Sequence, residues 1–176
     1  RRPIAVISFE NLTGDPEYDY LQRALPNLLI TSLERSEDLR VITWERMRDL
    51  VHQLGESDAA TIGSDLGFEA ARLDGVSALV TGSVTKAGDV FATDAKVLDV
   101  KTKSLLASSS SRGRGVDSIL SVQVDELSHH VLEGLGAEDR DSRAVERPIA
   151  EVTTDSMEAY ERFLQGKECY EKLYNT

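Results

Sequence analysis

The first third of the chain alternates short apolar runs with turn-forming segments, a pattern typical of buried strands and the loops that follow them. Residues 4–9 form an apolar, β-branched run, and residues 10–16 are dense in turn formers. Residues 39–44 again have strand character. Leucines at helical spacing lie between the two runs, so a helical crossover is expected, with the two strands parallel and the connection right-handed.

Pro26 determines where the crossover helix is expected to begin, because proline lacks the N–H that an interior helical position uses. The sequence predicts a turn around residues 17–23, then a helix that starts with Pro26 at its first position and runs to about Arg35. Two short helices are expected over residues 45–54 and 65–73, where they should cover the sheet.

From Ser77 onward the pattern becomes rich in β-formers. Strands are predicted over residues 77–85, 90–98 and 104–112, and their short connections permit only an antiparallel meander. Asp117 is expected to cap a helix that runs to residue 135 and closes the core. The predicted fold class is α/β: a mixed sheet of about five strands, one parallel pair plus the meander, covered by helices and followed by a C-terminal repeat-like helix.

The apolar pattern also divides the chain into three parts. Residues 1–136 are expected to form the α/β domain, residues 137–152 a charged linker, and residues 153–176 a truncated helical region capped by Asp155 or Ser156. Because the chain lacks an initiator methionine and starts with a strand pattern, we interpret it as a segment of a longer protein. The apolar residues of the last helix are Met157, Tyr160, Phe163 and Leu164.

Composition narrows the classes of function. The 176 residues carry a formal net charge of −11, which would repel a nucleic-acid backbone, so no nucleic-acid partner is expected. Cys169 is the single cysteine, which excludes an internal disulfide and a multi-thiolate zinc site, and we expect it to be a packing residue. No run of about 18 apolar residues occurs, so direct membrane insertion by this segment is not expected.

Candidate chemistry is sparse. There is neither a G-x-x-x-x-G-K-[ST] nor a G-x-G-x-x-G motif, and no G-x-S-x-G elbow surrounds residues 108–111. His129 and His130 point about 100° apart on a helix, so surface pairing with acidic neighbours is preferred to a metal site. Residues 112–115 are interpreted as a solvated, arginine-containing loop with some capacity for anions. We therefore expect no catalytic residue, no cofactor and no metal.

Three blocks of residues carry a family resemblance. The first comprises residues 4–6, 9–16, 18–21 and 39–42; the second comprises residues 80–84, 88–89, 98–99 and Thr102; the third comprises residues 154–160 with Leu164 and Gly166. Together they resemble the TolB-like amino-terminal domain of bacterial multidomain signalling proteins, at its junction with tetratricopeptide repeats. Lys103 departs from the glycine usual after Thr102, so a longer or strained turn is expected there. Gly166 and Tyr170 are four apart, where the repeat consensus has three.

The resemblance implies a non-catalytic regulatory or sensory protein-interaction module. Its effector, such as a serine/threonine kinase, a cyclase or a winged-helix regulator, would lie outside this segment. Expected partners are proteins: helical repeats of the same chain, the effector domain, or a second copy in a homodimer. The resemblance favours the extracytoplasmic side of a membrane-anchored protein over the cytoplasm.

Two alternatives remain open from the sequence. One is an envelope assembly or secretion-associated protein of the TolB/curli-like class. The other is a small-ligand binding domain that uses the loop residues Asn11, Thr13, Gly14 and Asp15. The candidate partner face of the last helix comprises Met157, Tyr160, Phe163 and Leu164. A complete tetratricopeptide repeat needs about 34 residues, more than the helical region of residues 153–176 provides. The apolar face cannot be covered by a repeat of its own, so it should pack on the domain itself or on a second molecule.

Overall fold

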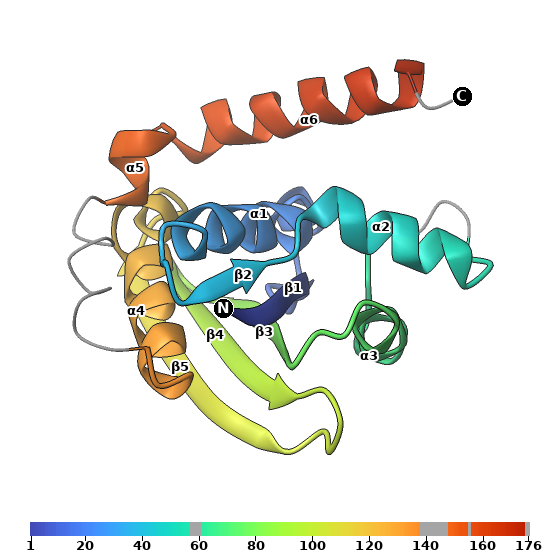
Figure 1. The fold of residues 1–176 in the computed structure, drawn as a ribbon. Helices are drawn as coiled ribbons and strands as arrows, with labels where there is room; N and C mark the ends of the chain where they lie inside the picture. The colour runs from blue at the N-terminus through green and yellow to red at the C-terminus, as the bar shows by residue number, and fades with distance from the viewer. Residues whose placement is uncertain (57–60, 138–147, 155, 175–176) are drawn as a thin grey trace.

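The fold is built on a five-stranded sheet in a computed structural model that describes residues 1–56, 61–137, 148–154 and 156–174. The strand order is β2-β1-β3-β4-β5 (Figure 1). β1 pairs in parallel with β2 and β3, and β3, β4 and β5 form an antiparallel meander, which confirms the predicted fold class. The strands are β1 (Arg2–Asn11), β2 (Leu39–Val41), β3 (Ala78–Ala87), β4 (Val90–Asp99) and β5 (Leu105–Arg114).

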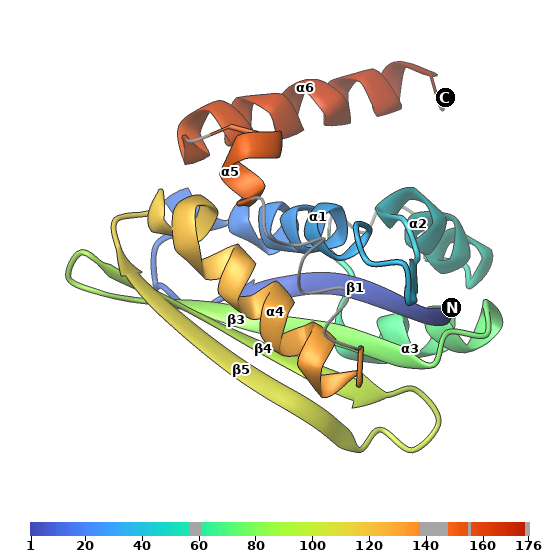
Figure 2. The ribbon, with the colours of Figure 1, turned by 60° about the vertical axis from the view of Figure 1, so that its left-hand side comes forward.

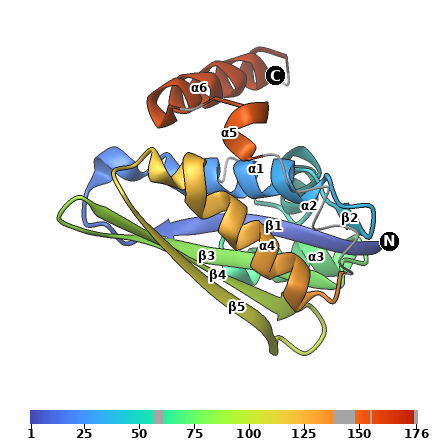
Figure 3. The ribbon, with the colours of Figure 1, turned by 90° about the vertical axis from the view of Figure 1, so that its left-hand side faces the viewer.

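Helices are layered on both faces of the sheet. α1 (Leu21–Leu33) and α4 (Val124–Gly134) pack on one face, and α3 (Ser64–Leu73) lies against β1 and β3 on the other (Figure 2). α2 (Trp44–Gln53) packs beside α3. α5 (Ile149–Val152) and α6 (Met157–Tyr174) form an outer layer above α1, best seen with the sheet edge-on (Figure 3). α3 does not extend over β4 and β5, so none of the helices in the described part of the chain covers that face of these two strands (Figure 1).

The core fills both faces of the sheet: α1 packs on one face, and on the other a Cβ at Gly67 of α3 would lie 3.0 Å from Ile7 and 3.6 Å from Leu79. Its largest fully buried side chains are Phe9, Ile4, Ile7, Leu21, Leu25, Leu28, Leu29, Leu33, Met47, Leu50, Ile62 and Leu79. Gly82 is needed for this packing, because a Cβ there would lie 1.9 Å from the Asp94 carbonyl oxygen and 2.6 Å from the Phe9 ring. Ile149, Met157, Tyr160 and Leu164 belong to the same hydrophobic cluster, so the layer formed by α5 and α6 is continuous with the core.

The prediction that Pro26 begins the crossover helix is wrong. α1 starts at Leu21 and contains Pro26 in its interior. An interior proline costs about 3 kcal/mol, whereas burying one leucine side chain contributes roughly 1.5–3 kcal/mol. Leu21 and Leu25 are both completely buried on the turns that the early start adds, so tertiary burial offsets the broken helix bond.

Two predicted element ends are also corrected. The strand expected over residues 39–44 ends at Val41, because Thr43 Oγ1 accepts the Arg46 N–H at 3.1 Å and caps α2. β5 continues to Arg114, so the arginines at positions 112 and 114 lie on a strand and not on the loop predicted for residues 112–115. Of the expected linker, residues 138–147 lie outside the described residues, and residues 149–152 form α5.

Candidate protein-interaction site

The C-terminal helix docks on the body of the domain through one face. Met157, Tyr160 and Leu164 are 0%, 5% and 4% exposed, whereas Phe163 is 59% exposed. The structure therefore separates the four residues of the candidate partner face. Three of them point into the domain, and Phe163 faces away from it.

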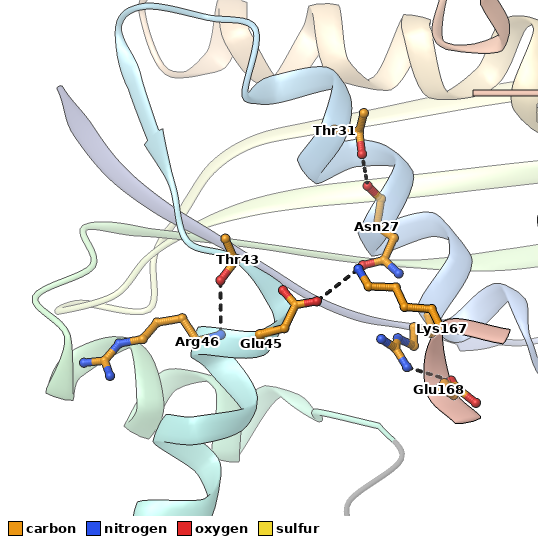
Figure 4. Close-up of polar contacts among 8 residues, drawn as sticks. Asn27, Thr31, Thr43, Glu45, Arg46, Lys167 and Glu168 are labelled. Atoms are coloured by element: carbon orange, nitrogen blue, oxygen red, sulfur yellow. Dashed lines mark hydrogen bonds and ion pairs between the residues drawn. The ribbon is translucent and has the colours of Figure 1, made fainter. Parts of the chain in front are cut away.

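Ion pairs hold the second half of α6 against α1 and α2. Arg23 Nη1 lies 2.7 Å from Glu168 Oε1, and Lys167 Nζ lies 3.0 Å from Glu45 Oε1 (Figure 4). The Arg23 guanidinium also stacks over the Trp44 ring at 5.5 Å. These contacts fix how far α6 can rotate or slide on the domain.

Burial and charge at this contact shift several pKa values. Burial raises the pKa of Tyr160 to about 12, because a phenolate would lose its hydration there. Burial alone would raise the pKa of the Glu45 carboxyl, but hydrogen bonds from its own backbone N–H and from Lys167 lower it overall. Burial and the nearby Glu45 charge raise the pKa of Glu34. The pairing of Glu45 with Lys167 is therefore favoured in its charged form.

Two carboxylates from distant segments cap the last two helices. Asp117 Oδ1 accepts the Met157 N–H at 2.8 Å, and Asp125 accepts the Ile149 N–H at 3.0 Å. The expectation that Asp117 caps its own helix is wrong: residues 119–123 form a π-helical segment whose N-cap, Ser118, makes no side-chain capping bond. Sequence reasoning missed both caps, because each acceptor and donor lie far apart along the chain. Ser156 Oγ accepts the Ala159 N–H at 3.4 Å, as expected for a local cap.

The candidate ligand loop is a turn closed by its own hydrogen bonds. The Asn11 side-chain amide donates to the Asp15 carbonyl oxygen at 2.9 Å and to Asp19 Oδ1 at 2.8 Å. The Thr13 hydroxyl donates to Asn11 Oδ1 at 2.6 Å, and Asp15 Oδ1 accepts the Glu17 N–H at 2.9 Å. Gly14 allows the turn through a φ of 77°. The polar groups of these side chains are thus engaged within the loop.

The histidines and the cysteine lie on exposed helix surfaces. His129 Nε2 is 3.3 Å from Glu133 Oε1, and His130 Nδ1 is 2.8 Å from Ser109 Oγ. The described part of the chain contains no group of three or more His, Cys, Asp or Glu side chains placed to hold a metal ion. Cys169 is exposed, which corrects the expectation of a packing cysteine, because it lies beside the docked face of α6 and not on it.

Comparison with known proteins gives one sequence relative and several similar folds. No family model matches the chain. A Rhizobium meliloti (strain 1021) protein named "Putative adenylate cyclase 3" is 28% identical over 132 residues, which is 75% of this chain and 20% of that protein. The chain therefore spans about a fifth of the length of the relative that it matches.

Solved structures share the fold at low sequence identity. The C-terminal domain of LpoB from Escherichia coli has a TM-score of 0.52 at 18% identity, over 64% of this chain and 82% of that one. Lipoprotein GNA1162 from Neisseria meningitidis has a TM-score of 0.52 at 17% identity, over 78% of this chain and all of the other. TolB from Acinetobacter baumannii has a TM-score of 0.49 at 16% identity, over 77% of this chain and 28% of that one. The first two similarities support the α/β architecture expected for a TolB-like fold.

Among the described residues, none of the helices combines the length and the apolar composition that crossing a bilayer requires.

Proposed function

We propose that this chain is a non-catalytic protein-interaction module whose contacts are made through the solvent-exposed side of its C-terminal helix. The observation that carries the proposal is the second apolar stripe of α6, separate from the docked face. It comprises Ala159, Phe163, Gly166 and Tyr170, spaced as one helical face. Phe163 and Tyr170 are 59% and 62% exposed.

Gly166 has no side chain, so it leaves a gap in this stripe where a partner helix could approach closely. A glycine inside a helix costs about 1 kcal/mol relative to alanine. A Cβ at Gly166 would meet nothing within 4 Å, so no contact among the described residues requires glycine there. A partner helix that crosses α6 at Gly166, between the two exposed rings, would use that gap. The Phe163 ring lies 5.8 Å from the buried Tyr160 ring, so the docked face supports one ring of the exposed stripe.

We place the domain boundary near residue 136 and assign residues 153–176 to the start of a helical repeat region. In this arrangement α6 connects two parts of a longer protein. Its docked face holds it to the α/β domain, and its exposed stripe receives the following helix or a second copy. The sequence relative, of which this chain spans about a fifth, supports a role as one part of a larger protein.

The fold similarities favour the envelope-associated class as the setting. One of the two structures with the higher TM-scores is named a lipoprotein. On this basis we propose an extracytoplasmic location for this chain. The second candidate, a regulatory domain of a signalling protein, is favoured by the match to a protein named as a cyclase.

A crosslinking experiment tests the interaction role. A photoreactive phenylalanine analogue replaces Phe163 in the full-length protein, and the control carries it at Glu69, which is exposed on α3. Crosslinks to a defined protein or protein segment from position 163, and none from position 69, are expected. Equal labelling at the two positions would contradict the proposal.

The gene around this segment separates the two settings. A signal peptide with a lipidated cysteine upstream supports the envelope class. A kinase, cyclase or winged-helix domain in the same reading frame supports the signalling class. In either setting, calorimetry with about 100 μM protein should detect no saturable heat with ATP, GTP or zinc.

A further inference from the structure

β5 forms a long free edge of the sheet. It has ten residues and pairs with β4 alone among the described strands, whereas the opposite edge strand, β2, has three residues. Edge strands present unpaired backbone donors and acceptors that another strand can use. Residues 108–114 are therefore a candidate surface for an added strand.

The direction of the free backbone groups follows from the pairing register. The Gly115 N–H donates to the Asp89 carbonyl oxygen at 2.7 Å, and Val90 is paired with Arg114. In an antiparallel ladder, hydrogen-bonded and non-hydrogen-bonded pairs alternate. The odd-numbered residues 107–113 therefore bond to β4, and the even-numbered residues 108–114 direct their N–H and C=O groups outward.

The side chains of those even-numbered residues lie on the sheet face that carries no helix at β5, and all of them are exposed. The odd-numbered serines point to α4 instead, where Ser109 bonds His130 and Ser111 bonds Glu126. At the start of β5, Val97 pairs with Ala107 and Leu98 with Leu105, so Leu106 is a bulge residue. The bulge ends the regular edge, and Leu106 is 39% exposed beside it.

Charge is distributed unevenly along this edge. Arg112 and Arg114 are exposed at one end, two residues apart on the same face. Within the described ranges, neither is joined to an acidic side chain by an ion pair. β5 itself contains no acidic residue. On the neighbouring strand, Asp94 pairs with Ser110 and Lys96 with Ser108 on the same face, so these two opposite charges offset each other. The two arginines therefore leave this edge with a net positive charge, on a chain with a net charge of −11.

We infer that β5 accepts an extended segment of a partner protein as a sixth strand, with acidic residues opposite Arg112 and Arg114. In an antiparallel arrangement the segment would carry two acidic residues two positions apart near its start. Small or β-branched residues would follow opposite Ser110 and Ser108, and an apolar residue would meet Leu106. Backbone bonds supply binding, and the two arginines supply the direction and the choice of partner.

A second copy of this chain fits the edge poorly. Its β5 would bring arginines and no acidic residue, and its other edge strand is too short to match. Charged side chains on an edge commonly prevent self-pairing, and here the same charges would select an acidic strand.

The binding test uses the full chain and a synthetic peptide, Glu-Thr-Glu-Thr-Val-Thr-Val-Thr-Leu, measured by calorimetry. The matched control peptide has lysine in place of both glutamates, and we expect it to bind at least about tenfold more weakly. The double variant Arg112→Glu, Arg114→Glu should reverse that preference. Failure of the glutamate peptide to bind at about 1 mM, or equal binding of both peptides, would overturn the inference.

Backbone geometry gives an independent readout. Bound peptide should slow amide exchange at Ser108, Ser110 and Arg112, which point outward, and leave the already bonded Ser109 and Ser111 unchanged. N-methylation of the peptide at its third, fifth and seventh residues should abolish binding, because those N–H groups face β5. N-methylation at the fourth, sixth and eighth residues should preserve it. Exchange slowed equally at odd and even residues would contradict strand addition.

A protein variant completes the test. Ser110→Pro removes one outward N–H, which an edge strand tolerates, and should weaken peptide binding about tenfold or more; Ser110→Ala should bind normally. If Ser110→Pro unfolds, the methylated peptides decide the question. If the protein self-associates and the peptide competes with that self-association, the edge of β5 pairs with a second copy of the chain. That result would overturn the inference.

This inference rests on the proposed protein-interaction role, but the experiment that tests it can fail independently of the crosslinking experiment. The crosslinking test concerns the exposed stripe of α6, which lies above α1, and the peptide test concerns the edge of β5 (Figure 3).

Discussion

Lys103 adopts a φ of 60° in the turn between β4 and β5, a conformation that favours glycine. The sequence indicated a longer or strained turn at this position, and the positive φ confirms the strain. Its Nζ lies 5.2 Å from the centre of the Phe68 ring, so a cation–π contact offsets part of the cost. The turn between β4 and β5 therefore imposes a left-handed backbone conformation on Lys103, although a residue with a Cβ disfavours that conformation.

The strain at Lys103 predicts the order of two variants. Lys103→Gly and Lys103→Ala both lose the contact with Phe68, but only the glycine variant relieves the left-handed backbone. We expect the glycine variant to have a free energy of unfolding about 1 kcal/mol larger than that of the alanine variant. Urea unfolding of the two proteins measures this difference. Equal midpoints and slopes would contradict a strained turn.

At the scale of elements, α6 is held on the domain by three kinds of contact. Its first N–H is capped by Asp117 from before the π-helical segment, its centre is buried through Tyr160 and Leu164, and its second half is tied by Glu168 to α1. Exposed ion pairs contribute about 0–1 kcal/mol each, so the buried side chains and the cap dominate the docking of this helix.

The cap predicts a specific effect on α6. Asp117→Ala removes the acceptor of the Met157 N–H and should destabilise the docking of α6 by about 1 kcal/mol. Asp117→Asn keeps an acceptor oxygen and serves as the control. Amide exchange in residues 157–170 should become faster in the alanine variant and change little in the asparagine variant. Faster exchange throughout the sheet would instead assign Asp117 to the stability of the whole domain.

Tyr160 predicts a loss of docking in alkali. Burial raises its pKa from 10.0 to about 12, so the released form ionises first as pH rises. Docking is therefore fully favoured below pH 10, weakens above it, and loses its whole Tyr160 contribution by about pH 12. Tyr160→Phe should remove this dependence. The difference in α6 amide protection between the two proteins across that range measures it, and a constant difference would contradict the assignment.

For the molecule as a whole, the sheet with α1 and α4 contains most of the buried side chains, and α6 adds a layer on top (Figure 3). Met157, Tyr160 and Leu164 are the part of the core that α6 supplies. Their loss would uncover apolar surface on α1 but leave the contacts between α1 and β1 intact. The body of the domain should therefore fold without α6.

Truncation tests this division of the molecule. Deleting residues 153–176 should leave a folded, monomeric domain with a lower melting temperature, because roughly 1.5–3 kcal/mol of burial is lost for each apolar side chain removed. Light scattering and circular dichroism on the full and shortened chains measure mass and folding. An unfolded product would make α6 an integral part of the core, and the boundary near residue 136 would be wrong.

Local patterns in the sequence were enough to predict the order of the strands and helices along the chain, and to predict a sheet that mixes parallel and antiparallel pairing. Alternation and helical spacing depend on neighbouring residues, and short connections restrict β3, β4 and β5 to antiparallel pairing. The apolar character of the last helix was also readable, since it depends on residues three and four apart.

The tertiary structure decided the features that depend on distant partners. Pro26 lies inside α1 because buried leucines outweigh a lost helix bond, and Asp117 caps α6 because folding brings the two together across 40 positions of sequence. The four apolar residues of α6 look equivalent in the sequence, but packing on α1 buries three and leaves Phe163 exposed. Likewise, Arg112 and Arg114 become a basic strand edge only because β5 is the last strand of the sheet, a position that no local pattern encodes.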